Sequence, residues 1–461
     1  MPFVNTIYKV IKNNIILIFV LICATSLEAQ VLNTSPFSRY GIGEMNTIQS
    51  SHYFSWGNIT SAMSEPQYIN TNNPASYASF LKYNPIYNVS LSGKSALYNS
   101  NYNGNETNSS GNNFGLNNLF LGLPITKNWG MVLGIAPVSS LGYHVSSTEP
   151  FDSSTVSYVY KGDGSINRLM IGNGFNIFNK GDTTRFSIGV NTSYIFGNLE
   201  RTSSVIYNNS NNYNSRVQYR SSLSGWSFDG GLQFYKRIKT LSDNKFFLNI
   251  GVNYSLNSEL STENDFFAYT FKYNFSIQEF PKDTLELANE TSSISIPEKL
   301  EFGLVFGKSH KNKRRWDLGL QYSYMDWAQY IDNSSFLSSS DFQLGPSTRI
   351  AVGYRITPNL DWSSANKSFL SKSTYSFGYH QTQSKIIITE NQLLNNGINF
   401  GVSIPMISSR SLSRINLGFE LGRLGELATD NIEENYFKFS IGFSLAPDTR
   451  YDRWFRKRKY D

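Results

Sequence analysis

The chain has 461 residues, a formal net charge of +6, 16% charged residues and 15% aromatic residues. Soluble domains usually carry about 25% charged residues, so this composition argues against an ordinary soluble domain. The small positive excess gives no basic stripe of the kind that nucleic-acid-binding proteins present, and we expect no nucleic-acid partner.

Residues 1–29 predict an export signal peptide. Lys9 and Lys12 precede a short apolar run at 15–24, and small residues follow that run. The run is too short to cross a bilayer as a helix. It contains Cys23, the only cysteine, so we expect a mature chain without disulfides or thiol-based sites.

Residues 30–83 are rich in Ser, Asn, Gly and aromatic residues and follow neither the helical nor the strand period. Because this segment precedes a long series of strands, we interpret it as an N-terminal hatch that plugs the lumen of a barrel. Asn73, Pro74 and Ala75 mark a turn near its end, since proline fixes φ and moves the preceding residue toward extended conformations.

Residues 84–446 alternate apolar and polar side chains, as in "FFLNIGVNYSL" and "YFKFSIGFSL". Side chains of a strand point alternately to opposite faces, so each segment has one apolar face. We predict fourteen strands, near residues 84–98, 113–124, 129–138, 166–178, 184–197, 223–237, 246–258, 295–308, 314–328, 346–357, 373–388, 396–406, 412–423 and 435–446.

The segments between these strands alternate in length, which discriminates between two all-β folds. Short connections alternate with long polar ones at 99–112, 139–165, 198–222, 259–294 and 329–345. A large soluble sandwich or propeller does not require this rhythm. Outer-membrane barrels do, because they have short periplasmic turns and long external loops. We therefore predict an all-β transmembrane antiparallel barrel that spans 84–446.

Residues 447–461 form a basic C-terminal tail that we expect on the periplasmic side. Trp454 and Phe455 lie among its arginines and lysines, so we expect the tail to dock on the barrel base, the hatch or a partner protein.

Several stretches resemble the FadL-type long-chain fatty acid transporters of bacterial outer membranes, in the versions found in Bacteroidetes. They are "GIGEM…NNPASYASF" in the opening segment, "LPITKNWGMVLGIAPV" at 123–138, "GDGSINRLMIGNGFNIFN" at 162–179, "IPEKLEFGLVFG" at 296–307 and the C-terminal "FSIGFSL…DRWFRKRKYD". The resemblance implies a fourteen-stranded barrel with an N-terminal hatch in the outer membrane of a Gram-negative bacterium. It also implies that external loops capture a hydrophobic ligand, which then binds beside the hatch. The ligand would leave either after a rearrangement of the hatch or sideways through the barrel wall.

Candidate ligand contacts lie in two places. The 259–294 segment departs from the family pattern, and we expect it to form a projecting hairpin or an extension of the wall. Its aromatic residues Phe267, Tyr269 and Phe271 could bind an acyl chain or simply pack within the hairpin. A fatty-acid carboxylate needs a basic partner such as Arg39 or a lumen-facing Arg185.

The sequence gives no sign of catalysis, cofactor or metal binding. The four histidines are widely spread and have no metal-ligand spacing. No Gly-x-Ser-x-Gly or His-Glu-x-x-His motif occurs. We therefore expect a non-enzyme without catalytic residues or a metal site.

Three functions remain open at this point. The leading hypothesis is uptake of long-chain fatty acids or other hydrophobic small molecules, in contact with outer-membrane lipid. The second is a FadL-like component of a protein secretion or surface-assembly machine, with a periplasmic or secretion-machinery protein as partner. The third, a plain diffusion porin, has no use for a fifty-residue plug.

Overall fold

The structure is a computed structural model. It describes residues 35–47, 50–102, 105–152, 154–181, 183–208, 212–241, 244–273, 279–310, 314–334, 343–360, 369–388, 391–406, 412–427 and 431–447. The predicted signal peptide and nearly all of the predicted C-terminal tail lie outside these residues. No helix of the described part has the length and apolar character needed to cross a membrane.

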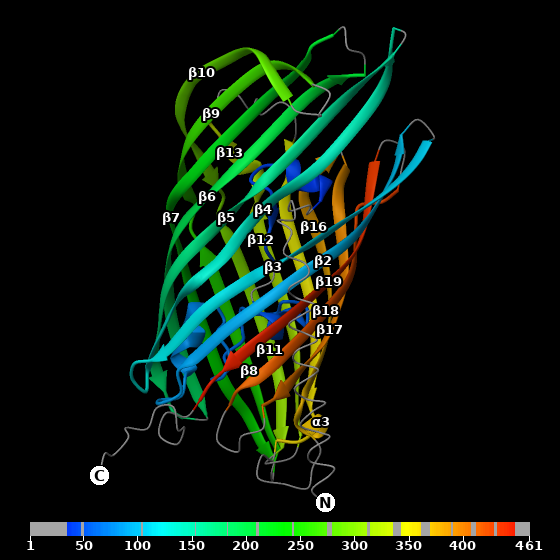
Figure 1. Ribbon diagram of the computed structural model, residues 1–461. Coiled ribbons are helices and arrows are strands. Elements are labelled where there is room, and N and C mark those ends of the chain that lie inside the picture. The colour runs from blue at the N-terminus through cyan, green and yellow to red at the C-terminus, as the bar shows by residue number, and fades with distance from the viewer. Residues whose placement is uncertain are drawn as a thin grey trace, which may run out of the picture.

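The chain forms a closed antiparallel β-barrel of fourteen strands (Figure 1), as the alternation predicts. Closure comes from the last strand, whose Leu445 and Asn431 pair with Tyr87 and Asn101 of the first. The strands are β2 (Ile86–Tyr102), β3 (Asn105–Pro124), β4 (Trp129–Phe151), β5 (Ser154–Asn179), β6 (Thr184–Tyr207), β7 (Asn214–Leu241), β8 (Asn244–Ser255), β9 (Ser258–Tyr273), β10 (Glu279–Ile296), β11 (Lys299–His310), β12 (Arg315–Asp326), β13 (Ile331–Asp332), β14 (Gln343–Leu344), β15 (Pro346–Thr357), β16 (Thr374–Ile388), β17 (Asn391–Pro405), β18 (Arg414–Leu424) and β19 (Asn431–Leu445). Four of the fourteen barrel strands each consist of two consecutive elements of this list: β8 with β9, β10 with β11, β12 with β13, and β14 with β15.

The barrel presents apolar side chains outward and polar ones inward. On β11, Leu300 and Phe302 are exposed while the intervening Glu301 is buried. On β8 the buried positions include Asn249 and Asn253. A wall in lipid requires this inversion, and pairing between neighbouring strands satisfies the backbone groups that face hydrocarbon.

The wall is much taller on one side than on the other (Figure 1). Strand β7 has 28 residues and β5 has 26, whereas β12 has 12 and β18 has 11. The sequence prediction of long loops at 99–112, 139–165 and 198–222 is therefore wrong, because strands continue through most of their described residues, whereas 259–294 extends the wall, as one of its two predicted forms allowed. Extended hairpins satisfy their own backbone groups above the bilayer, so the polar, Ser- and Thr-rich stretches continue as paired strands.

Residues 35–47 and 50–83 fill the interior of the barrel, and we name them the plug. The plug contains η1 (Pro36–Arg39), β1 (Glu44–Met45), α2 (Ser51–Phe54) and η2 (Pro74–Ser79). Its large side chains are buried against inward-facing wall residues in four clusters, around Phe37, around Ile42, around Trp56 and around Tyr77. Two further short helices, η3 (Trp327–Gln329) and α3 (Phe369–Lys372), lie between wall strands.

Glycines in the wall let the plug backbone approach it closely. A Cβ atom on Gly251 would collide with the carbonyl group of Ser61, and one on Gly189 would collide with Pro74. Alternation alone leaves such inward glycines without a role, and their contact with the plug supplies one.

Candidate functional site

The lower part of the plug is held by a buried ionic network. Arg355 of β15 donates to both Glu65 oxygens, at 2.7 and 3.0 Å, and its Nε donates to Asp317 of β12 at 2.6 Å. Its guanidinium also lies 4.8 Å from the ring centroid of Trp56. All these charged side chains are at most 7% exposed. Such groups are stable in a lumen only as a paired set.

His52 belongs to the same network. Its Nε2 lies 3.1 Å from the Glu65 carboxylate, and its ring stacks on Tyr68 at a centroid distance of 3.7 Å. Burial lowers the pKa of His52 to about 4 despite the raising effect of Glu65. The imidazole is therefore neutral at neutral pH.

The upper part of the plug, residues 35–47, is held by a separate set of ionic contacts. Glu44 lies 2.9 Å from Lys94 of β2 and 3.5 Å from Lys438 of β19. Lys94 also pairs with Glu434 at 2.6 Å, and the Ser35 hydroxyl donates to the other oxygen of that carboxylate. The Glu44 side chain is 30% exposed, so this contact is more hydrated than the lower network.

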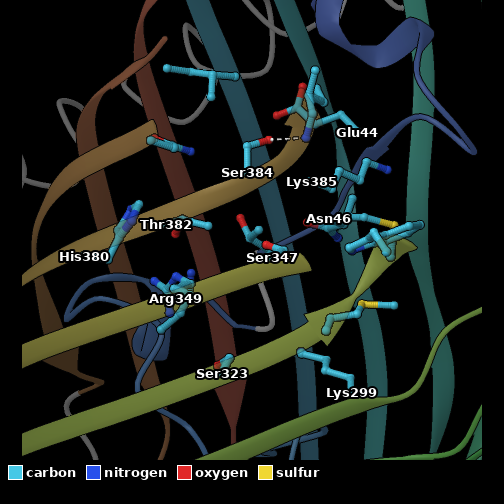
Figure 2. Close-up of a pocket in the computed structure, with 18 of the residues that line it drawn as sticks. Glu44, Asn46, Lys299, Ser323, Ser347, Arg349, His380, Thr382, Ser384 and Lys385 are labelled. Atoms are coloured by element: carbon cyan, nitrogen blue, oxygen red, sulfur yellow. Dashed lines mark hydrogen bonds between the residues drawn. The ribbon is translucent and has the colours of Figure 1, made fainter. Parts of the chain in front are cut away.

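A cavity of about 290 Å³ lies between the upper plug and the wall strands β11 to β19 (Figure 2). Part of its lining is apolar, from Phe37, Met45, Met325, Trp327, Ile386 and Leu424. The other part is charged and polar. Figure 2 shows Lys299, Arg349, His380 and Lys385 around it.

Two cations of this lining have no carboxylate partner among the described residues. Arg349 donates to the carbonyl oxygen of Gly57 at 2.8 Å. Lys385 donates to the carbonyl oxygen of Gly43 at 3.1 Å and lies 4.0 Å from the ring centroid of Trp327. The cavity thus combines an apolar wall with two cations that form no ion pair among the described residues, while Glu44, Glu301 and Glu420 supply negative charge elsewhere in the lining.

A second cavity, of about 300 Å³, lies where the wall opens between β3 and β4. These strands pair only between 119–124 and 130–135. Above that, β3 continues with β2 alone, while β4 continues with β5. Plug strand β1 lies at this gap and pairs with Ser139 and Ser140 of β4.

Residues 44–47 line both cavities. They bridge the gap, because β1 is paired to β4 while the Asn46 side chain donates to Asn117 of β3 at 3.0 Å. A displacement of this short segment would join the lumen cavity to the opening in the wall.

The predicted hatch turn lies against the wall in the lower plug. Asn73 caps η2 by accepting from Ala75, and its Nδ2 donates to the carbonyl oxygens of Ser61 and Leu232 at 2.7 and 3.1 Å. Pro74 is the first residue of that helix and is buried. These contacts fix the tripeptide in place, and its role in hatch movement stays a prediction.

The predicted ligand contacts lie apart from both cavities. Phe267, Tyr269 and Phe271 share one face of β9, opposite to the face that carries Leu260 into the lumen cluster. This stretch pairs with β7 and β10 as an extension of the wall. Arg39 is exposed beside Tyr40. A ligand role for these residues stays a prediction.

Arg185 faces the lumen as predicted and contacts the plug. Its Nη2 donates to the Ser64 hydroxyl at 2.8 Å, and it lies outside both cavity linings. The lining cations Arg349 and Lys385 were not singled out from the sequence. The only sequence feature that marks them is a basic residue on the polar face of a predicted strand, in "TRIAVGYRI" and in "SKIII". Many surface strands have such a residue, so this feature does not identify a binding site.

Comparison with known proteins gives two kinds of result. No curated protein matches the chain. A FadL homologue from Pseudomonas aeruginosa is 11% identical with a TM-score of 0.53, over 88% of this chain and 99% of that one. The toluene transporter TodX from Pseudomonas putida is 15% identical with a TM-score of 0.51, over 86% and 98%.

At these identities the two proteins share the fold with this chain, which confirms the FadL-type architecture that the sequence predicts. The family relation comes from a different comparison. A family model described as BamG matches residues 10–461, almost the whole sequence. The chain belongs to the BamG family.

Proposed function

We propose that this barrel admits hydrophobic or amphipathic small molecules, long-chain fatty acids among them, across the outer membrane of a Gram-negative bacterium of the Bacteroidetes type. The observation that carries the proposal is that residues 44–47 separate a lumen cavity from an opening in the wall. A ligand enters from outside, binds in the lumen cavity and leaves sideways between β3 and β4 when this segment moves.

The lining of the lumen cavity supports an amphipathic ligand with an anionic group. Arg349 and Lys385 offer donors without a carboxylate partner, and charge-assisted bonds to an anion are stronger than neutral ones. The apolar residues of the same lining, Trp327 and Ile386 among them, contribute about 0.8 kcal/mol for each methylene that they bury.

The volume of the cavity supports the lateral route. At about 290 Å³ it lies just below the range for small-molecule pockets, which begins at about 300 Å³. A small aromatic compound fits within such a space. A long acyl chain needs the second cavity as well, so its binding requires the displacement of residues 44–47.

Uptake of two probes tests this proposal. Cells that lack the chain are complemented with the wild type or with Arg349→Met, Lys385→Met, and uptake of radiolabelled oleate and of toluene is measured. We expect the double variant to lower oleate uptake at least tenfold and toluene uptake less than twofold. Lys127→Met, in the exposed turn between β3 and β4, is the matched control.

Wild-type cells that take up neither probe faster than cells without the chain would contradict transport itself. Equal losses of both probes in the double variant would contradict the anion-binding role alone.

A second function, as a non-transporting subunit of a secretion or surface-assembly machine, is favoured by a separate observation. The match to the BamG family spans almost the whole chain, whereas the likeness to transporters rests on 11–15% identity. The buried network around Arg355 also suits a permanent stopper. Purification of the tagged chain from native membranes distinguishes the two functions, because a subunit co-purifies with its partners in fixed stoichiometry and a transporter does not.

A further inference from the structure

Strand β4 has an edge that the barrel does not use. It pairs with β5 along its whole length, from Trp129 to Phe151. Its other edge pairs with β3 only up to Ile135. Everything above that residue is a sheet edge in the described part of the chain, next to the equally open upper edge of β3.

The plug already occupies the lower part of this edge as extended polypeptide. Strand β1 pairs with Ser139 and Ser140. The backbone N–H of Asn46 donates to the carbonyl oxygen of Val138 at 2.8 Å, and that of Ser35 donates to the carbonyl oxygen of Gly142 at 3.1 Å. The edge is therefore shaped and positioned to accept an added strand.

Above Gly142 the same edge is free in the described residues. Backbone groups of alternate residues face the same edge, so His144, Ser146 and Thr148 present their N–H and C=O groups where Gly142 does. All three residues are exposed. The edge ends at Pro150, which has no N–H to donate.

Proteins usually protect such edges with lysines, bulges or covering segments, because a bare edge recruits other strands. Between Gly142 and Pro150 there is no lysine and no irregularity in the β4–β5 register. Only Pro150, at the tip, limits pairing. A bare edge that continues an existing strand–strand contact is a surface built for strand addition.

We propose that the β4 edge at 143–149 binds an extended segment of a partner protein as an additional β-strand. The added strand continues the line of contact that β1 begins. This proposal does not depend on whether the barrel transports small molecules.

The neighbouring side chains define the chemistry of the partner segment. On the inner face of the sheet, the added segment would lie beside Tyr143 and Val145 of β4, and Tyr160 of β5 lies opposite Val145. On the outer face it would lie beside His144, which pairs with the exposed Lys161. The segment therefore has apolar residues at alternate positions and polar or acidic residues between them.

Photo-crosslinking in intact cells tests this proposal. The crosslinking residue benzoylphenylalanine replaces His144 in the full chain, combined either with Ser146→Pro and Thr148→Pro or with Ser146→Ala and Thr148→Ala. Proline removes the edge N–H groups, whereas alanine retains them. We expect the adduct to a partner polypeptide to fall at least tenfold with proline and less than twofold with alanine.

Three outcomes overturn the proposal: no adduct at all, equal adduct in the proline and alanine variants, or an adduct that proves to be a second copy of this chain. Benzoylphenylalanine in place of Ser222, on a strand paired on both sides, serves as the negative control.

Hydrogen exchange keeps the test decisive if the proline variant does not fold. In the purified wild type, the amides of 144, 146 and 148 should exchange quickly, and those of 145 and 147 slowly. In native membranes we expect exchange at the three edge amides to slow at least tenfold. Unchanged rates in native membranes would contradict strand addition.

Discussion

The lower and upper parts of the plug are continuous in sequence but are held in different ways. The lower part, residues 50–83, is wedged against wall glycines and anchored by the buried Glu65–Arg355–Asp317 network. The upper part, residues 35–47, borders both cavities and is anchored through the partly exposed Glu44. The difference teaches that one segment can serve as a fixed stopper and as a movable partition.

Removal of Arg355 should have the largest effect on the lower part. Arg355→Met leaves the buried Glu65 with only the neutral His52 and the buried Asp317 with only Arg315 as partners, and breaking a buried pair in this way costs about 3–5 kcal/mol. The free energy of unfolding in urea, measured on the protein in detergent or lipid, checks this value.

Arg220→Met is the matched control, because the Arg220–Glu200 pair lies in the exposed part of the wall. Exposed pairs contribute about 0–1 kcal/mol. Similar losses in the two variants would contradict the special status of the lower network.

Acid should loosen the lower part through His52. Its pKa is about 4 in the folded state and 6.5 in its ordinary environment, so between these values the unfolded chain binds the proton more readily. The contribution of His52 to the free energy of unfolding is therefore fully present above pH 6.5 and is lost as the pH falls toward 4. This contribution is at most about 3 kcal/mol. Thermal unfolding of the wild type and of His52→Asn at several pH values checks this, and parallel pH profiles would contradict it.

Wall glycines that touch the plug should tolerate alanine less well than wall glycines that face open space. Gly251→Ala places a Cβ against the backbone of Ser61, and overpacking of this kind costs typically about 1–3 kcal/mol. Gly115→Ala, on β3, meets open space and should change stability by less than about 0.5 kcal/mol. Chemical denaturation measures the free energy of unfolding of both variants. Equal values for the two variants would contradict the contact between the lower plug and the wall.

The smallest effect on stability is expected in the upper part. Glu44→Gln removes the charge that pairs with Lys94 and Lys438, and partly exposed pairs contribute about 1 kcal/mol or less. Ion leak through the purified barrel in planar bilayers should nevertheless rise, because this contact fixes the partition. An unchanged leak would show that other contacts hold residues 44–47.

The barrel could be predicted from the sequence because its pattern is local. Leu248, Ile250 and Val252 alternate with Asn249 and Gly251, and the structure places the apolar set outward as the pattern requires. The height of the wall could not be predicted in this way. Above the bilayer, strands such as 139–151 and 198–207 lose the outward apolar face, keep only a few inward apolar residues such as Leu141 and Leu199, and resemble polar loops in sequence.

The candidate site could be predicted only in outline. The position of a plug follows from a segment that lacks strand periodicity, but its contacts depend on pairs far apart in the chain. Glu44 and Lys94 are joined by closure of the barrel around the plug, and Arg355 meets Glu65 in the same way. The aromatic residues of 267–271 looked like ligand contacts by composition, yet strand parity places them on the face opposite to Leu260.

Tethering experiments compare the two parts of the plug most directly. The mature chain as predicted has no cysteine, so pairs can be introduced and bridged with a short dithiol-specific reagent. Asn46→Cys with Asn117→Cys ties the upper part to β3, and Ser51→Cys with Ser440→Cys ties the lower part to β19. Oleate uptake is then measured before bridging, after bridging and after reduction. We predict that the upper tether reduces uptake at least tenfold and reversibly, while the lower tether changes it less than twofold. Uptake that survives the upper tether, or that is lost with the lower one, would contradict the account.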